Sequence, residues 1–155
     1  MFPKWGILTW VMKMKTNQEI LSSILKTTQM GQVGIRSVQD RALNPSLQKA
    51  LESQLKEYDA IEDKAHTLAA QQGWELPELN AGVRLMSDMA SRMKLSYSQS
   101  DSKIADMMIL GNTRGMIKGL KNMHHWKEHD SQIENLSQKL IDTEVANIRQ
   151  MEPFL

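Results

Sequence analysis

The chain has no cysteine among its 155 residues, only 5% aromatic residues and only 4 prolines. Without cysteine it can form no disulfide, no zinc–thiolate site and no iron–sulfur cluster, so we expect a cytoplasmic protein. With so few prolines, long stretches keep Leu, Ile, Val, Ala and Met at helical spacing. No strand pattern interrupts them, and the sequence therefore predicts an all-α protein.

A surplus of charge of one sign is also missing. The 19 basic and 18 acidic residues are mixed along the chain and leave a net charge of +1. Such a mixture provides no basic surface for nucleic acid and no polybasic segment for anionic lipid. The apolar runs are also too short to span a bilayer. We therefore expect neither a nucleic-acid partner nor a transmembrane segment.

The first residues differ from the rest because they are rich in aromatic and apolar side chains. We interpret residues 1–15 as an N-terminal extension, since Met14 and Lys15 resemble a natural chain start. Its expected states are disorder or packing of the Trp side chains on a neighbouring surface. The alternative is weak contact of residues 2–12 with a membrane surface, because amphipathic segments bind there.

Residues 16–153 read as a single domain of long helices. A capping box at Thr16 and Glu19 starts a helix over residues 17–43. Asn44 and Pro45 suit the N-cap and first position of a second helix, over residues 45–72, which Gly73 ends.

Two further long helices follow a region of broken pattern. Residues 73–100 carry a Trp, a Pro and a Gly that interrupt the periodicity, with a short helix predicted over residues 79–97. Residues 101–126 form the next helix. A second capping box at Ser131 and Glu134 then starts a helix over residues 131–152.

The lengths of the connections predict how these helices are arranged. Both short turns join antiparallel hairpins, whereas residues 73–100 are numerous enough to cross the length of a bundle. Two hairpins joined by one long crossover are the ferritin-like arrangement, and an up-down-up-down bundle is the competing topology. We predict a four-helix bundle of ferritin-like topology.

Three glycines lie four residues apart inside the predicted helix 101–126: Gly111, Gly115 and Gly119. A glycine inside a helix costs about 1 kcal/mol relative to alanine, so another interaction must offset the loss. Together with Gly31 in helix 17–43, they predict close helix packing between the first and third long helices. The alternatives are a ligand on the glycine face and a local break of the helix near Gly111.

The chain resembles a family of uncharacterised ferritin-like helical proteins of clostridia and related bacteria. The likeness is carried by residues 26–31 (KTTQMG), 51–58 (LESQLKEY) and 104–115 (IADMMILGNTRG). It covers about residues 17–152 and leaves the N-terminal extension outside. The resemblance implies a four-helix fold and no particular activity.

A ferritin-like bundle raises the question of a metal centre. A di-iron site needs a Glu-x-x-His pair on each of two helices, and this chain contains no such pair. Glu62 and His66 are one helical turn apart, and His125 and His129 would have ligand spacing if their helix continued that far. These pairs are the candidate ligands for iron, zinc or another divalent metal. The alternatives are a solvated helix face and a basic helix end, in which case no cofactor is expected.

The sequence leaves three functions open. The leading hypothesis is a non-enzymatic structural or interaction protein that self-associates as a homo-oligomer or binds a protein partner. The second is a ferritin-like metal-binding or oxidative-stress protein. The third follows from the 12 methionines, which are flexible and polarisable and can line a groove. In that case the chain is a carrier of a small apolar ligand, and an enclosed apolar cavity beside Gly111 and Gly115 would support it.

Overall fold

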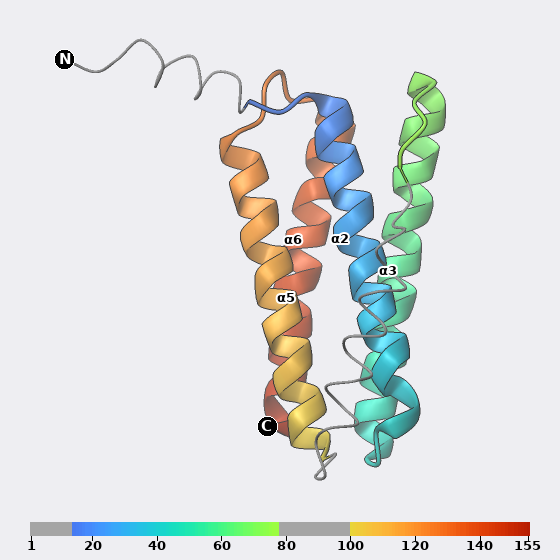
Figure 1. Cartoon of the computed structure of the whole chain (residues 1–155), viewed down its shortest axis with the longest axis vertical. Helices are drawn as coiled ribbons and strands as arrows, with labels where there is room; N and C mark the ends of the chain where they lie inside the picture. The colour runs from blue at the N-terminus through green and yellow to red at the C-terminus, as the bar shows by residue number, and fades with distance from the viewer. Residues whose placement is uncertain (1–13, 78–99) are drawn as a thin grey trace, which may run out of the picture.

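In the computed structural model, residues 14–77 and 100–155 are described, and their long helices form a bundle (Figure 1). These helices are α2 (Asn17–Val38), α3 (Pro45–Gln72), α5 (Asp101–His124) and α6 (Ser131–Met151), with short 3-10 helices η1 (Gln39–Arg41) and η2 (Glu152–Phe154). The described residues include no strand, only an isolated bridge between Lys15 and Trp126. The all-α prediction is confirmed. The predicted helix 79–97 and residues 1–13 of the N-terminal extension lie outside the described residues.

The predicted helix starts at Thr16 and Asn44 are confirmed. The side chain of Thr16 accepts from the backbone N–H of Glu19 at 3.2 Å, which completes the capping box of α2. Asn44 caps α3, whose first residue is Pro45. Gly73 ends α3 with φ of 69°, a left-handed conformation that glycine adopts without a steric cost.

Two helices end earlier than predicted. The first α-helix stops at Val38 instead of residue 43, and η1 follows it. The backbone N–H groups of Leu43 and Asn44 donate instead to the carboxylate of Asp101, at 2.8 and 2.9 Å. Helix α5 stops at His124 instead of residue 126, because the residues after it bond to the segment before α2. In both cases a long-range hydrogen bond replaces the last helical turn.

The N-cap predicted for the last helix was wrong by one residue. Asp130 caps α6, since its carboxylate accepts from the N–H groups of Gln132 and Ile133 at 2.9 and 3.0 Å. Glu134 does not reach back in a capping box and lies 3.2 Å from His129 Nδ1. A carboxylate one residue earlier therefore takes the role that the pattern gave to Ser131.

The helices pack as two hairpins, α2 with α3 and α5 with α6, and the hairpins meet where α3 contacts α6 and α2 contacts both α5 and α6. In Figure 1, α3 ends at the end of the bundle where α2 begins, and α5 starts at the opposite end. Helices α3 and α5 therefore run in the same direction. The core contains the apolar stripes of all of these helices, centred on Leu21, Ile35, Leu51 and Ile104.

Candidate functional site

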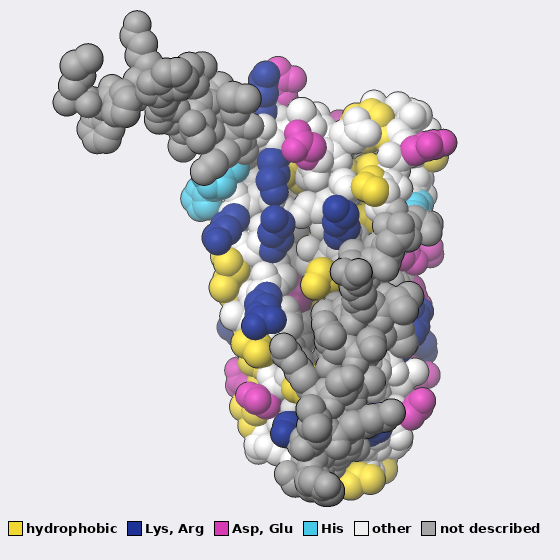
Figure 2. Space-filling model, in the orientation of Figure 1, with side chains coloured by type: hydrophobic (Ala, Val, Ile, Leu, Met, Phe, Trp, Pro, Cys, Tyr) yellow, Lys and Arg dark blue, Asp and Glu magenta, His cyan; other side chains and the backbone are white. Residues whose placement is uncertain are grey.

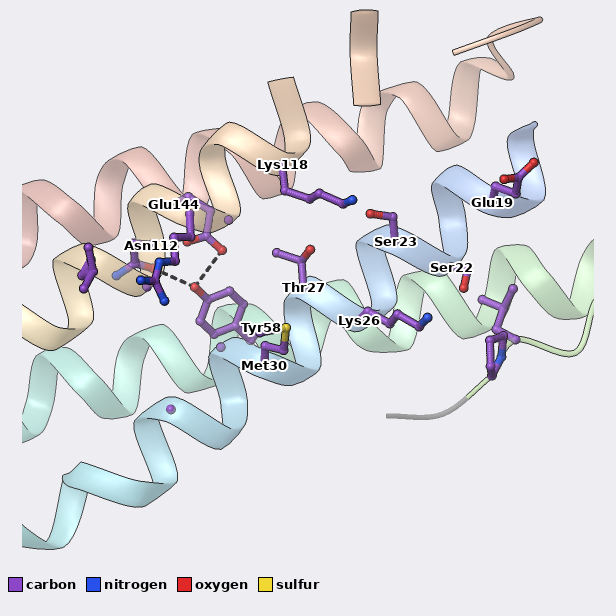
Figure 3. A pocket seen from close by; sticks show the side chains of 18 of the residues that line it. Glu19, Ser22, Ser23, Lys26, Thr27, Met30, Tyr58, Asn112, Lys118 and Glu144 are labelled. Carbon is purple, nitrogen blue, oxygen red and sulfur yellow. Dashed lines mark hydrogen bonds between the residues drawn. The ribbon is translucent and has the colours of Figure 1, made fainter. Parts of the chain in front are cut away.

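A cluster of buried polar side chains interrupts the apolar core halfway along the bundle. Tyr58 comes from α3, Asn112 from α5, and Glu144 and Asn147 from α6, and all are buried. The hydroxyl of Tyr58 lies 2.9 Å from Asn112 Oδ1 and 2.9 Å from Glu144 Oε1 (Figure 3). Asn147 Nδ2 donates to the same hydroxyl at 3.3 Å. The phenol oxygen therefore links three helices through hydrogen bonds.

The protons of this cluster indicate that Glu144 is neutral. The single phenol proton of Tyr58 cannot serve both acceptors at once. Asn112 cannot turn its amide to help, because its Nδ2 already donates to the carbonyl of Met108 at 2.7 Å. Asn147 Nδ2 lies 3.5 Å from Asn112 Oδ1, a long contact, so a protonated Glu144 that donates to the phenol best completes the cluster. Burial raises the pKa of Glu144 to about 8, against an opposing effect of the hydrogen bond from Tyr58.

Burial also raises the pKa of Tyr58, and the charge of an ionised Glu144 beside it raises it further. The phenol therefore keeps its proton throughout the physiological range. Together the two groups form a neutral hydrogen-bonding surface in the core, able to donate and to accept, at neutral pH.

Two of the glycines make room for this pair. A Cβ on Gly31 would lie 2.6 Å from the ring of Tyr58, and a Cβ on Gly115 would lie 3.0 Å from the carboxyl carbon of Glu144. Gly119 similarly faces Ile141, at 2.7 Å. The close contact predicted for these glycines is therefore made with side chains of α3 and α6, whereas we expected α2 and α5 to meet each other there.

Gly111 behaves differently from the other glycines. Among the described residues, no atom lies within 4 Å of the position that a Cβ would take on Gly111. No described residue therefore provides the predicted close packing at Gly111. Helix α5 is nevertheless continuous through Gly111, so the alternative of a local break is wrong.

The open space beside Gly111 is a groove of about 970 Å³ between α2 and α5. Its walls include the thioethers of Met30, Met107 and Met108 together with Leu110, and its floor reaches Tyr58 and Glu144. This volume lies at the upper end of the range for small-molecule sites. Unbranched, polarisable Met side chains can adapt their shape to a bound molecule.

Cationic side chains surround the groove: Lys15, Lys26, Arg114 and Lys118. Figure 2 shows Lys and Arg side chains gathered on this face, and Figure 3 shows Lys118 extending from α5 toward α2. Burial and the nearby charge of Lys118 lower the pKa of Lys15, whose Nζ donates to Asn122 Oδ1 at 2.8 Å. Within the described part of the chain, Lys26, Arg114 and Lys118 make no ion pair. Among the described lining residues these four cations outnumber the carboxyl groups, which are Glu19 and the neutral Glu144, so the described rim has a surplus of positive charge.

The first pair of candidate metal ligands lies on α3, and neither residue lines this groove. Glu62 accepts a hydrogen bond from Gln29 Nε2 at 3.2 Å, and His66 is exposed one turn later. Among residues 14–77 and 100–155, no group of three or more His, Asp or Glu side chains could hold a metal ion. The described residues thus bring no third ligand to this pair.

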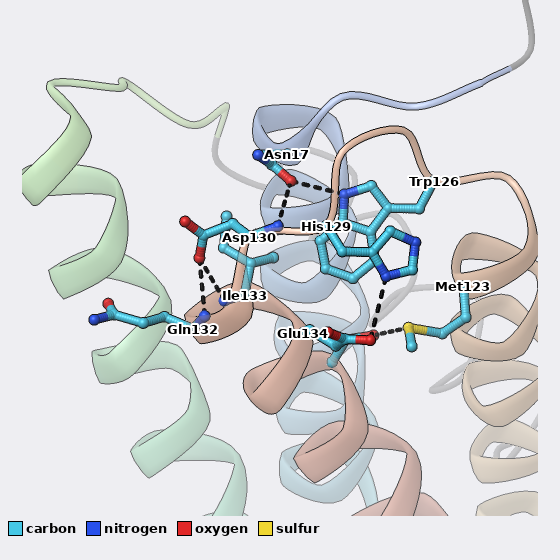
Figure 4. Close-up of polar contacts among 9 residues, drawn as sticks. Asn17, Met123, Trp126, His129, Asp130, Gln132, Ile133 and Glu134 are labelled. Atoms are coloured by element: carbon cyan, nitrogen blue, oxygen red, sulfur yellow. Dashed lines mark hydrogen bonds and ion pairs between the residues drawn. The ribbon is translucent and has the colours of Figure 1, made fainter.

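The second pair of candidate ligands falls in the turn between α5 and α6, where Figure 4 shows His129. The ring of His129 stacks on Trp126 with centroids 4.2 Å apart, and Trp126 Nε1 donates to Asn17 Oδ1 at 2.8 Å. His125 Nδ1 is buried without a hydrogen-bond partner in the described structure. Because α5 ends at His124, His125 and His129 do not share the helix face that ligand spacing requires. Their contacts are those of packing residues.

Sequence reasoning missed the buried polar cluster as a site. A signal was present, since Glu144 and Asn147 fall on the same stripe of α6 as Leu136, Leu140 and Met151, all of them buried. A polar residue on an apolar stripe is informative because its burial needs a partner. The partner could not be found from spacing, because Tyr58 is 86 residues away along the chain.

No protein-family model, no curated protein and no solved structure matches the chain. In the described residues, no helix has the combination of length and apolarity that crossing a membrane requires.

Proposed function

We propose that this protein binds a small amphipathic anion in the groove between α2 and α5, and acts as its carrier or sensor. The observation that carries this proposal is the combination of an apolar groove beside Gly111 and a cationic rim without described ion-pair partners. A ligand with a hydrocarbon body and a carboxylate, sulfonate or phosphate head matches both parts. The proposal favours the carrier over the two other functions that the sequence leaves open.

The chemistry of the groove supports one orientation for such a ligand. Lys15 and Lys118 are close enough to repel each other, and an anionic head between them would relieve that repulsion. The apolar body would contact Met30 and Met107, with burial worth about 25 cal/mol per Å² of apolar surface. The floor would present the neutral Tyr58–Glu144 pair rather than a second anion.

The order and direction of the helices support the ferritin-like topology and the family resemblance as proposals. Parallel α3 and α5 need a connection that spans the bundle, and residues 73–100 provide one. In ferritin-like proteins the bundle centre holds metal, whereas here the equivalent depth contains Tyr58, Asn112 and one buried carboxyl. This donor set favours an organic ligand over a metal ion as the molecule bound.

Calorimetric titration with three twelve-carbon probes tests the proposal. Dodecanoate has an anionic head, dodecan-1-ol a neutral one and dodecyltrimethylammonium a cationic one. We expect dodecanoate to bind most tightly, with one molecule per chain. Equal affinity for all of them would contradict a role for the cations, and no binding of dodecanoate would contradict the proposal itself.

Variants then assign the binding to the groove. Lys118→Glu should weaken dodecanoate binding about tenfold, because it replaces an attraction with a repulsion. Lys121→Glu is the matched control, since Lys121 is exposed on the same helix and does not line the groove. Gly111→Phe should abolish binding while the chain stays folded, because its side chain enters the groove and no described residue packs against the Cβ position. Unchanged affinity in Gly111→Phe would place the ligand elsewhere.

A further inference from the structure

The outer face of α5 carries apolar side chains that nothing in the described structure covers. Leu110, Ile117 and Leu120 are 52%, 43% and 45% exposed. They fall on a stripe that alternates steps of four and three residues along the helix: Asp106, Leu110, Thr113, Ile117, Leu120 and His124. This alternation is the seam of a coiled coil, because it keeps one stripe facing a partner helix. We call these six residues the α5 seam.

The α5 seam is complementary to itself when two copies run in opposite directions. In the register that places Leu110 opposite Leu120 of a second copy, Thr113 lies opposite Ile117, and Asp106 lies opposite His124. Lys121, one turn before His124, adds a positive charge near Asp106 of the other copy. A two-fold axis repeats each of these contacts, so one stripe provides both sides of the interface.

A parallel arrangement would lose this match. Each residue would then face the same residue of the second copy, so the two Asp106 side chains would lie together and their like charges would repel. The antiparallel register has one like-charge contact of its own, because Arg114 of each copy comes near the two-fold axis. Arg114 is exposed, so salt screens that repulsion, and it is outweighed by the burial of the apolar layers.

We propose that a second copy of this chain packs on the α5 seam, with the two α5 helices antiparallel. A single pair of helices makes a small interface, so we expect a dissociation constant in the micromolar range. The proposal does not depend on what the groove binds. Leu110 is the one seam residue that also lines the groove, and Arg114, near the two-fold axis, lines the groove as well.

A pair of engineered cysteines tests the register directly, because the chain has no cysteine of its own. In one copy, residues 110 and 120 are about 15 Å apart along the helix, too far for an internal disulfide. In Leu110→Cys/Leu120→Cys, mild oxidation should convert most of the protein into a covalent dimer. Either cysteine alone should not cross-link, since each would face a leucine. Cross-linking by the single variants as well, or none by the double variant, would overturn the proposal.

Sedimentation equilibrium tests the interface without cysteines. Ile117→Asp should weaken dimerisation at least tenfold, because it buries a charge in the centre of the seam. Ala146→Asp is the matched control, since it adds the same charge to an exposed position on α6. A wild-type chain that stays monomeric at several hundred micromolar would overturn the proposal. So would a dimer that forms only after deletion of residues 1–13, which would assign the seam to the chain's own first residues.

Discussion

The same substitution, glycine to alanine, should have opposite effects on stability at Gly111 and at Gly31. Gly111→Ala replaces a helical glycine where no described residue packs within 4 Å of the added methyl, so it should stabilise the fold by about 1 kcal/mol. Gly31→Ala gains the same helix preference but places its methyl 2.6 Å from the ring of Tyr58. The two substitutions are chemically identical, and only the surroundings differ.

The size of the Gly31→Ala effect follows from how the Tyr58 ring is fixed. An ordinary contact needs about 1 Å more separation, and overpacking of this kind costs about 1–3 kcal/mol. Moving the ring also strains its hydrogen bonds to Asn112 and Glu144, each worth about 1 kcal/mol. After the gain in helix preference, the net loss should be about 2 kcal/mol.

Thermal unfolding followed by circular dichroism distinguishes the two variants. For a chain of 155 residues, each kcal/mol shifts the midpoint by about 2–4 °C. The midpoint of thermal unfolding should therefore rise by about 2–4 °C in Gly111→Ala and fall by about 4–8 °C in Gly31→Ala. In a double-mutant cycle, Tyr58→Leu should remove most of the cost of Gly31→Ala. If Gly31→Ala proves as stable as the wild type, this result would contradict the close contact between the Tyr58 ring and Gly31 of α2.

The remaining predictions concern buried and capping carboxyls. Burial raises the pKa of Glu144 from 4.5 to about 8, so the folded state retains a proton that the unfolded state loses between these values. The free energy of unfolding should therefore fall as pH rises through this window, and in Glu144→Gln this slope, measured by urea titration, should disappear. Asp101→Ala should cost about 1–2 kcal/mol in the same assay, because it frees the N–H groups of Leu43 and Asn44. Asp106→Ala, an exposed carboxylate on the same helix, should change stability by less than about 0.5 kcal/mol, and an equal loss in both variants would exclude a specific role for Asp101.

Local sequence signals predicted most helix boundaries because caps act over one turn. Thr16 with Glu19, Asn44 with Pro45, and Gly73 each satisfy or redirect backbone groups of residues close by in the chain. The predictions failed where a distant group intervened. Asp101 accepts hydrogen bonds from Leu43 and Asn44 in the turn between α2 and α3. At the other end of the bundle, the backbone hydrogen bonds of Lys15 with residues 125 and 127 coincide with the early end of α5.

The candidate site shows the same division between short and long range. The sequence indicated a constrained glycine stripe and Met-rich apolar stripes, and one of its alternatives was an enclosed apolar cavity beside Gly111 and Gly115. The structure instead has an open groove with a cationic rim there. It could not indicate that Gly31 faces Tyr58 or that Gly115 faces Glu144, since each pair joins two different helices. It also drew attention to His125 and His129, which the structure assigns to packing in a turn.

The sequence by itself therefore determined the all-α class, the long helices, most of their caps and the expectation that the glycines are constrained. Each of these depends on residues within a few positions of one another, where helix geometry fixes the distances. Tertiary structure alone decided that a carboxyl and a phenol meet in the core, and that a groove opens above them. Helix geometry fixes the face on which a side chain lies, whereas only the packing of whole helices decides what lies opposite it.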